Sequence, residues 1–213
     1  AGDNQEQCNT ATFTLNATAP AVGTGVWSGT LPAGASIADV NLHNTTVTLP
    51  AGQTVTLTWT VSNGVCPATT DEVTLVNLEP IAGNTITDDQ TICDNTTPAA
   101  LTGSTPTGGD GTAYRYQWQS STSNTPASFT DIAGATSAGY APGQLTATTY
   151  YRRVVTSGAT TTGSCSAISN VITITVNPLP VFTVTNVAAI CNTVSSFDVR
   201  YTNTIGAPNR YDL

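Results

Sequence analysis

The sequence contains no lysine and no methionine, and it has a single histidine, His43. All five of its basic residues are arginines: Arg115, Arg152, Arg153, Arg200 and Arg210. Only 8% of the residues are charged and the formal net charge is −8, a balance that disfavours binding to a phosphate backbone or an anionic membrane. No apolar run is long enough to span a bilayer. We therefore expect neither nucleic-acid binding nor membrane insertion.

The sequence also lacks a convergent set of catalytic residues. His43 is the only side chain suited to proton transfer near neutral pH, and no Ser-His-acid spacing surrounds it. The acid pairs Asp71-Glu72 and Asp88-Asp89 are adjacent in sequence, so on a strand their members point to opposite faces. Such pairs do not converge on one bond of a substrate. We predict no catalytic residue and no cofactor.

Apolar residues alternate with threonines at a period of two. Threonine, a β-branched residue suited to the solvent face of a strand, makes up about a fifth of the chain. The alternating runs are Thr12–Thr18, Gln53–Asn63, Tyr114–Gln119 and Val171–Val176. Turn formers separate these runs, and no segment has a sustained helical stripe. The pattern predicts an all-β sandwich or barrel.

The aromatic residues are predicted to be core residues. Those on the apolar parity of the expected strands are Trp27, Trp59, Tyr114, Tyr116 and Trp118. Sugar binding by stacking would instead need an exposed row of aromatic rings.

The five cysteines indicate a repeat. Cys8, Cys93 and Cys191 each precede an apolar run, whereas Cys66 and Cys165 each follow a long predicted strand. Each complete unit thus has one early and one late cysteine. We predict the disulfides Cys8–Cys66 and Cys93–Cys165, with Cys191 unpaired in this stretch. Disulfides imply an oxidising, extracellular compartment.

Metal binding is not predicted. The cysteines form no CxxC pair, and His43 is distant from all of them in sequence. Glu79, Asp88 and Asp89 flank the first expected unit boundary, where acids would hold Ca²⁺ and stiffen the connection, but the spacing of a known multi-acid site is absent.

Prolines mark the boundaries between units. Leu78-Glu79-Pro80 and Asn177-Pro178-Leu179-Pro180 are extended, semi-rigid segments. They divide the chain into residues 1–79, 80–178 and 179–213. The last part offers two strands, about Val181–Thr185 and Ser196–Thr202, which cannot bury a core alone. We expect it to be the start of a third repeat that continues past Leu213 or is completed by a partner.

Several segments resemble the PKD-like and Ig-like repeats of Bacteroidota surface proteins. In the first unit these are Pro20–Ser28 (PAVGTGVWS) and Thr56–Cys66 (TLTWTVSNGVC). In the second they are Tyr116–Ser121 (YQWQSS) and Thr149–Val155 (TYYRRVV). The resemblance implies tandem Ig-like and PKD-like β-sandwiches, arranged end to end in long cell-surface proteins of the type IX secretion and gliding-motility adhesin kind.

One departure from antibody-type Ig domains concerns the buried disulfide. Where strand F would carry a cysteine, this sequence has an arginine, either Arg152 or Arg153, and Cys165 comes later, near the F–G turn. This favours a disulfide near the end of the sandwich.

Two functions are consistent with these features. The first is a non-catalytic structural or adhesive repeat region of a secreted surface protein, forming a disulfide-stapled stalk or filament. Its partners would be neighbouring repeats, surface polysaccharide or other adhesin subunits. The alternative is a carbohydrate-binding or spacer module of a large secreted polysaccharide-degrading enzyme, which an exposed aromatic row would favour.

Overall fold

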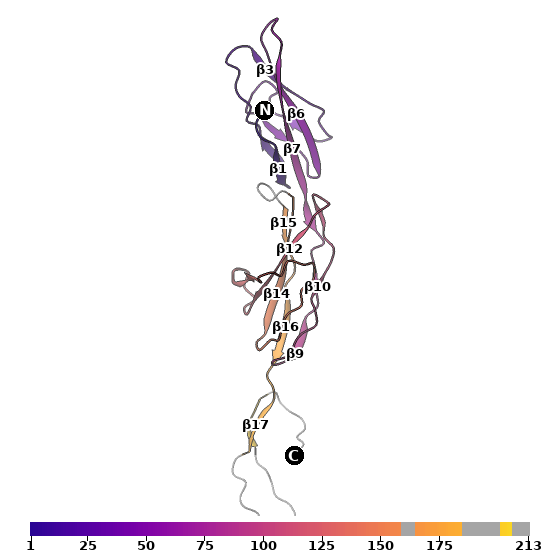
Figure 1. Ribbon diagram of the computed structural model, residues 1–213, viewed down its shortest axis with the longest axis vertical. Coiled ribbons are helices and arrows are strands. Elements are labelled where there is room, and N and C mark those ends of the chain that lie inside the picture. The colour runs from indigo at the N-terminus through magenta and orange to yellow at the C-terminus, as the bar shows by residue number, and fades with distance from the viewer. Residues whose placement is uncertain (159–164, 185–200, 206–213) are drawn as a thin grey trace, which may run out of the picture.

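A computed structural model describes residues 1–158, 165–184 and 201–205 of the chain. The regular structure of this part is β-strand, apart from one 3-10 turn, η1 (Pro126–Ser128). Figure 1 shows two successive bodies along the long axis, with a further pair of strands beyond the second. The predicted all-β architecture is confirmed.

The first body, called the first sandwich, consists of two sheets that share one core. One sheet has the order β1 (Gln5–Cys8), β7 (Thr69–Ala82), β6 (Gln53–Ser62) and β3 (Thr24–Ser28). The other has the order β2 (Thr12–Thr14), β5 (Thr46–Thr48) and β4 (Ser36–Ile37). Strand β1 runs parallel to β7, and the remaining pairs are antiparallel.

The alternation in the sequence places the core of this sandwich. In β6, Val55, Leu57 and Trp59 are buried, while Thr54 and Thr56 on the other parity are exposed. Burying the three apolar side chains removes them from water at about 1.5–3 kcal/mol each, an upper estimate. This favourable term fixes the register of β6.

The second body, called the second sandwich, has one large sheet and one small one. The large sheet has the order β13 (Thr130–Asp131), β12 (Arg115–Ser121), β14 (Thr149–Ser157), β16 (Ile172–Asn177) and β9 (Gln90–Cys93), with β15 (Cys165–Ile168) also paired to β14. The small sheet pairs β8 (Ile86–Thr87) with β10 (Thr102–Gly103). Strand β9 runs parallel to β16, as β1 runs parallel to β7.

The three tryptophans occupy the cores, as predicted. Trp27 and Trp59 are buried in the first sandwich with ring centres 5.0 Å apart, and Trp118 is buried in the second. Tyr114 and Tyr116 are half-buried rather than fully enclosed.

An arginine occupies the core of the second sandwich. Arg153, not Arg152, is the inward residue: it is fully buried and pairs across the ladder with Trp118. Both residues belong to the large sheet. Of the two arginines that the sequence left open, Arg153 is therefore the one that faces the core.

The two sandwiches are joined by one continuous strand. β7 leaves the first sandwich, passes through Pro80 and ends at Ala82, and its last residues pair with β11 (Thr107–Gly109) of the second sandwich. The predicted division between residues 79 and 80 therefore falls inside a strand.

Beyond the second sandwich, β17 (Val181–Val184) pairs antiparallel with β18 (Tyr201–Ile205). Strand β17 lies within the first expected strand of residues 179–213. Strand β18 overlaps the last two residues of the second expected strand, whose residues 196–200 lie outside the described part of the chain. Cys191 lies outside the described residues.

Candidate functional site

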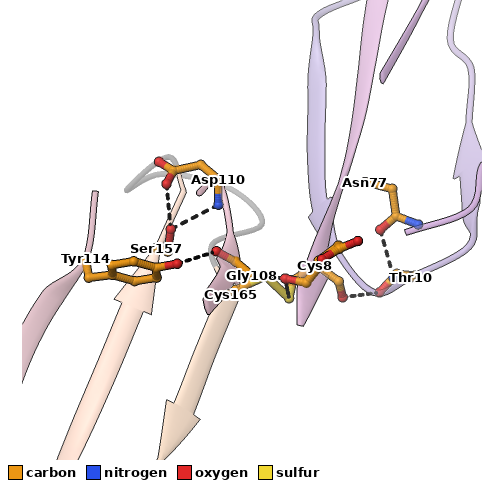
Figure 2. Close-up of a disulfide and its surroundings, with 9 residues drawn as sticks. Cys8, Thr10, Asn77, Gly108, Asp110, Tyr114, Ser157 and Cys165 are labelled. Atoms are coloured by element: carbon orange, nitrogen blue, oxygen red, sulfur yellow. Dashed lines mark hydrogen bonds between the residues drawn. A yellow bond between two sulfur atoms is a disulfide. The ribbon is translucent and has the colours of Figure 1, made fainter. Parts of the chain in front are cut away.

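The two sandwiches are linked by a disulfide between Cys8 and Cys165. Cys8 ends β1 of the first sandwich, and Cys165 begins β15 of the second. Figure 2 shows this bond at the contact between the two bodies. We call this contact, made by β7, β11 and the disulfide, the junction. It is the candidate functional site.

The predicted pairings Cys8–Cys66 and Cys93–Cys165 are wrong. The early and late cysteines of one sandwich lie at its opposite ends: Cys8 is level with Leu78 near the end of β7, whereas Cys66 precedes Thr69 at its start. Nine residues of strand separate these levels by roughly 30 Å. A disulfide requires Cα atoms within about 7 Å.

The same reasoning separates Cys93 from Cys165. Cys93 is level with Asn177 at the end of β16, while Cys165 is level with Ser157 at the opposite end of the sheet. Cys66 and Cys93 are free and exposed. The expected position of a disulfide near a sandwich end is correct, but the bond joins two units.

On the first-sandwich side, a buried amide anchors the chain around Cys8. The side chain of Asn77 in β7 donates to the carbonyl of Leu49 at 2.7 Å and accepts from the backbone N–H of Thr10 at 3.2 Å. The hydroxyl of Thr10 donates back to the carbonyl of Cys8 at 3.2 Å. Asn77 thus fixes the exit of β1, because leaving its amide unpaired would cost about 1–3 kcal/mol.

On the second-sandwich side, a small polar network supports β11 and the end of β14. The hydroxyl of the buried Ser157 donates to Asp110 Oδ1 at 2.8 Å, and the backbone N–H of Asp110 donates to Ser157 Oγ at 3.0 Å. The hydroxyl of Tyr114 donates to the carbonyl of Gly108 at 2.8 Å (Figure 2). Since Ser157 is level with Cys165, this network positions the disulfide.

The carboxylate of Asp110 is held in its charged form. The backbone N–H groups of Ala113 and Thr112 donate to it at 3.0 and 2.9 Å, and Ser157 adds its hydroxyl. These hydrogen bonds keep the pKa of Asp110 well below its usual range.

Glycine permits the close approach of β11 to β7. Gly108 has φ +80°, and a Cβ atom there would overlap the carbonyl oxygen of Pro80. Any other residue would push the two strands apart, since both the backbone conformation and the space favour glycine.

A cleft of about 270 Å³ opens beside the junction. Its walls come from both sandwiches and include Glu6, Asn77 and Asp110. Among the described residues no group of three His, Cys, Asp or Glu side chains gathers to hold a metal ion.

The residues first considered for chemistry have structural contacts. His43 is half-buried, and its carbonyl accepts from the backbone N–H of Ala17. Glu72 accepts from the hydroxyl of Thr58, and Asp89 accepts from the backbone N–H of Thr173 at 2.7 Å. In the described part of the chain, the large apolar side chains that stand exposed are aliphatic, so no aromatic row is present there.

Comparison with known proteins bears on the fold. A family model described as a domain of unknown function (DUF8696) matches residues 82–178. No curated protein matches the sequence. Among solved structures, extracellular domains 3–5 of Drosophila OTK are 11% identical with a TM-score of 0.51, over 82% of this chain and 59% of that one. A titin I67–I69 structure is 13% identical with a TM-score of 0.49, over 84% and 65%.

The likeness to OTK, together with the sheet order, shows that the chain is built of Ig-like β-sandwiches. The chain spans less than two thirds of the length of these two structures. The described residues contain no helix of the length and apolarity that crossing a membrane requires.

Proposed function

We propose that this chain is a non-catalytic structural or adhesive repeat region, in which Ig-like sandwiches are stapled end to end into a stalk or filament. The observation that carries the proposal is the Cys8–Cys165 disulfide, which covalently joins two sandwiches already connected by β7. Such a bond does not stabilise one domain by itself. It restricts the orientation of one domain relative to the next, as a column of domains with a fixed direction requires.

The disulfide also changes the path of a pulling force. A load applied between the chain termini passes from Cys8 directly to Cys165, and the intervening residues form a covalently closed loop. The sequence separation of these cysteines is 157, so most residues of both sandwiches lie inside the loop and are shielded from extension. The stalk would therefore resist lengthening even when a sandwich opens.

The proposed setting is extracellular, because a structural disulfide persists in oxidising compartments. The resemblance of the sequence to Bacteroidota surface repeats extends the proposal to the surface of such a cell, with export by type IX secretion. Neighbouring repeats are the proposed partners, with surface polysaccharide or other adhesin subunits at the free end. The carbohydrate-binding alternative stays a hypothesis that no contact described above favours.

Single-molecule extension between the two termini tests the proposal. Under oxidising conditions the loop stays closed. With reductant, complete unfolding should add about 50 nm of contour length, from a sequence separation of 157 at roughly 3.3–3.6 Å per residue. The Cys8→Ser/Cys165→Ser variant is the control, and it should show the longer extension with or without reductant. Equal contour lengths for oxidised and reduced wild-type protein would refute the load-bearing role.

A further inference from the structure

Among the described residues, the free cysteines Cys66 and Cys93 occupy the same places in their sandwiches as the bonded Cys165 and Cys8. Cys8 ends β1, level with Leu78 of the parallel strand β7. Cys93 ends β9, level with Asn177 of the parallel strand β16. Cys93 is therefore the counterpart of Cys8 one unit later.

Local hydrogen bonds repeat this correspondence. The residue after Cys8, Asn9, donates its backbone N–H to the carbonyl of Leu78 at 3.0 Å. The residue after Cys93, Asp94, donates to the carbonyl of Asn177 at 2.8 Å.

A threonine hydroxyl completes the equivalence. Thr96 donates to the carbonyl of Cys93 at 2.7 Å, as Thr10 does to Cys8 at 3.2 Å. The sequence Cys-Asn-Thr at residues 8–10 recurs at residues 191–193, so Cys191 is of the same early kind.

Cys66 is in turn the counterpart of Cys165. Cys66 lies between β6 and β7, the last two long strands of the first sandwich. Cys165 lies at the end of the corresponding connection, which follows β14 in the second sandwich. The observed disulfide thus joins the early cysteine of one sandwich to the late cysteine of the next.

The next junction begins in the same way as the first. At the first junction, Ala82 pairs antiparallel with Thr107. After the second sandwich, Val181 pairs antiparallel with Ile205. Val181 follows Asn177 at the same sequence interval as Ala82 follows Leu78, and Ile205 follows Cys191 at the same interval as Thr107 follows Cys93. A third unit therefore begins next to Cys93, in the same way that the second sandwich begins next to Cys8.

Two apolar side chains are exposed at the opposite end of the first sandwich. Val65, next to Cys66, is 103% exposed, and Val22 is 68% exposed. Val22 belongs to the same end, because its neighbour Gly23 lies against the backbone of Ser62 where β6 ends. At the equivalent end of the second sandwich, Cys165 is fully buried by the first sandwich.

We propose that Cys66 and Cys93 are open halves of further inter-unit disulfides. Cys93 bonds the late cysteine of the unit that begins at Val181, and Cys66 bonds the early cysteine of a unit docked beyond Val65. The inference rests on the proposed tandem array. It specifies that array: each unit is bonded to both neighbours, through one early and one late cysteine.

The bond-forming step is an ordinary thiol oxidation. Two thiols lose two protons and two electrons as the S–S bond forms. An external disulfide, such as oxidised glutathione, accepts the electrons and protons by exchange and leaves as two thiols.

Disulfide mapping of the protein purified from its source cells tests the proposal. Free thiols are alkylated first, and the unreduced protein is digested and analysed by mass spectrometry. Trypsin is unsuitable because Arg115 is the first arginine, so Cys8, Cys66 and Cys93 would remain on one peptide. Chymotrypsin combined with a glutamate-specific protease separates them, by cutting at Trp59 and Glu72, for example.

The expected result is one peptide linking Cys8 to Cys165 and two others linking Cys93 and Cys66 to cysteines of neighbouring units. In the 213-residue chain produced alone, Cys66 and Cys93 should instead be alkylated, while Cys8 and Cys165 are protected. Alkylation of Cys66 or Cys93 in the native protein, or a Cys8–Cys66 or Cys93–Cys165 peptide, would overturn the proposal. The extension measurement on the 213-residue chain does not depend on this outcome, so the two failures are distinguishable.

Discussion

The buried guanidinium of Arg153 donates twice to a single acceptor, Oδ1 of Asn84, from Nε at 3.0 Å and from Nη2 at 2.9 Å. It also donates to the carbonyls of Ala138 and Ser104, at 2.7 and 2.9 Å. Asn84 and Ser104 flank the small sheet, whereas Arg153 belongs to the large one. The arginine therefore ties the two sheets together where antibody-type domains have a cystine.

Among the residues that the structure describes, no carboxylate forms an ion pair with Arg153. Its neutral acceptors and the ring of Tyr116, whose centre is 4.9 Å from the guanidinium carbon, replace the lost hydration. Burial lowers the pKa of Arg153 from its ordinary value. An arginine stays protonated under these conditions, so the fold must supply all of its hydrogen bonds.

We predict that Arg153→Met destabilises the second sandwich by about 3 kcal/mol, because the acceptors on Asn84, Ser104 and Ala138 lose a buried donor. Urea unfolding followed by circular dichroism measures this loss. The matched control is Arg152→Met. Arg152 is only half-buried, donates to Gln119 at 2.6 Å and stacks on Phe129, and its loss should cost under about 1 kcal/mol. Equal losses in the two variants would contradict the role assigned to Arg153.

The space for the guanidinium is supplied by Gly103. A Cβ atom at this position would overlap Nη1 of Arg153, which cannot retreat because its partners hold it on both sides. Gly103→Ala should therefore destabilise the chain by about 1–3 kcal/mol through overpacking. Gly143→Ala is the control, since a Cβ there meets nothing within 4 Å. Thermal unfolding of both variants is sufficient, and an unchanged melting temperature for Gly103→Ala would count against the packing argument.

Sequence periodicity predicted the strands with a regular apolar alternation, such as β6, and the core residues that they contribute. The period-two pattern around Leu57 and Trp59 reports a local property, the alternation of side chains across a strand. The sequence limited the inward-facing arginine to two neighbouring positions, Arg152 or Arg153. It could not choose between them, because a shift of one residue in register decides which of the two faces inward.

The disulfide pairing was not predictable by the same route. Counting early and late cysteines correctly revealed the repeat, but it assigned Cys8 to Cys66 within a unit. Whether a strand pairs parallel or antiparallel decides at which end of the sandwich its last residue lies. The parallel pairing of β1 with β7 puts Cys8 beside the next unit. Asn77 and Ser157 gave no signal in the sequence, since their roles arise from contacts between distant segments.

Acid should weaken the network around Asp110. The folded-state pKa of this carboxylate is lower than its unfolded value of about 3.9, so the charged form stabilises the fold above about pH 4. This stabilisation is lost as the pH falls through the lower, folded-state pKa. At pH 7, wild-type protein should therefore have a higher melting temperature than Asp110→Asn. The difference between the two melting temperatures should shrink below about pH 3. A difference in melting temperature that is the same at both pH values would exclude this linkage.

Loss of the junction disulfide should lower the free energy of unfolding of the two linked sandwiches. The Cys8–Cys165 bond closes a loop with a sequence separation of 157, and the chain-entropy account gives an upper estimate of about 5 kcal/mol for such a loop. Cys8→Ser/Cys165→Ser should therefore unfold at a lower urea concentration than wild type, as followed by tryptophan fluorescence in the absence of reductant.

The matched control for this experiment is Cys66→Ser/Cys93→Ser, which removes the same number of sulfur atoms from exposed, unbonded positions. Surface substitutions of this kind change stability by under about 0.5 kcal/mol. Reductant should bring wild type and the control down to the level of Cys8→Ser/Cys165→Ser. If the control lost as much stability as Cys8→Ser/Cys165→Ser without reductant, the bond would not be the cause, because only one of the two variants breaks a covalent link between the sandwiches.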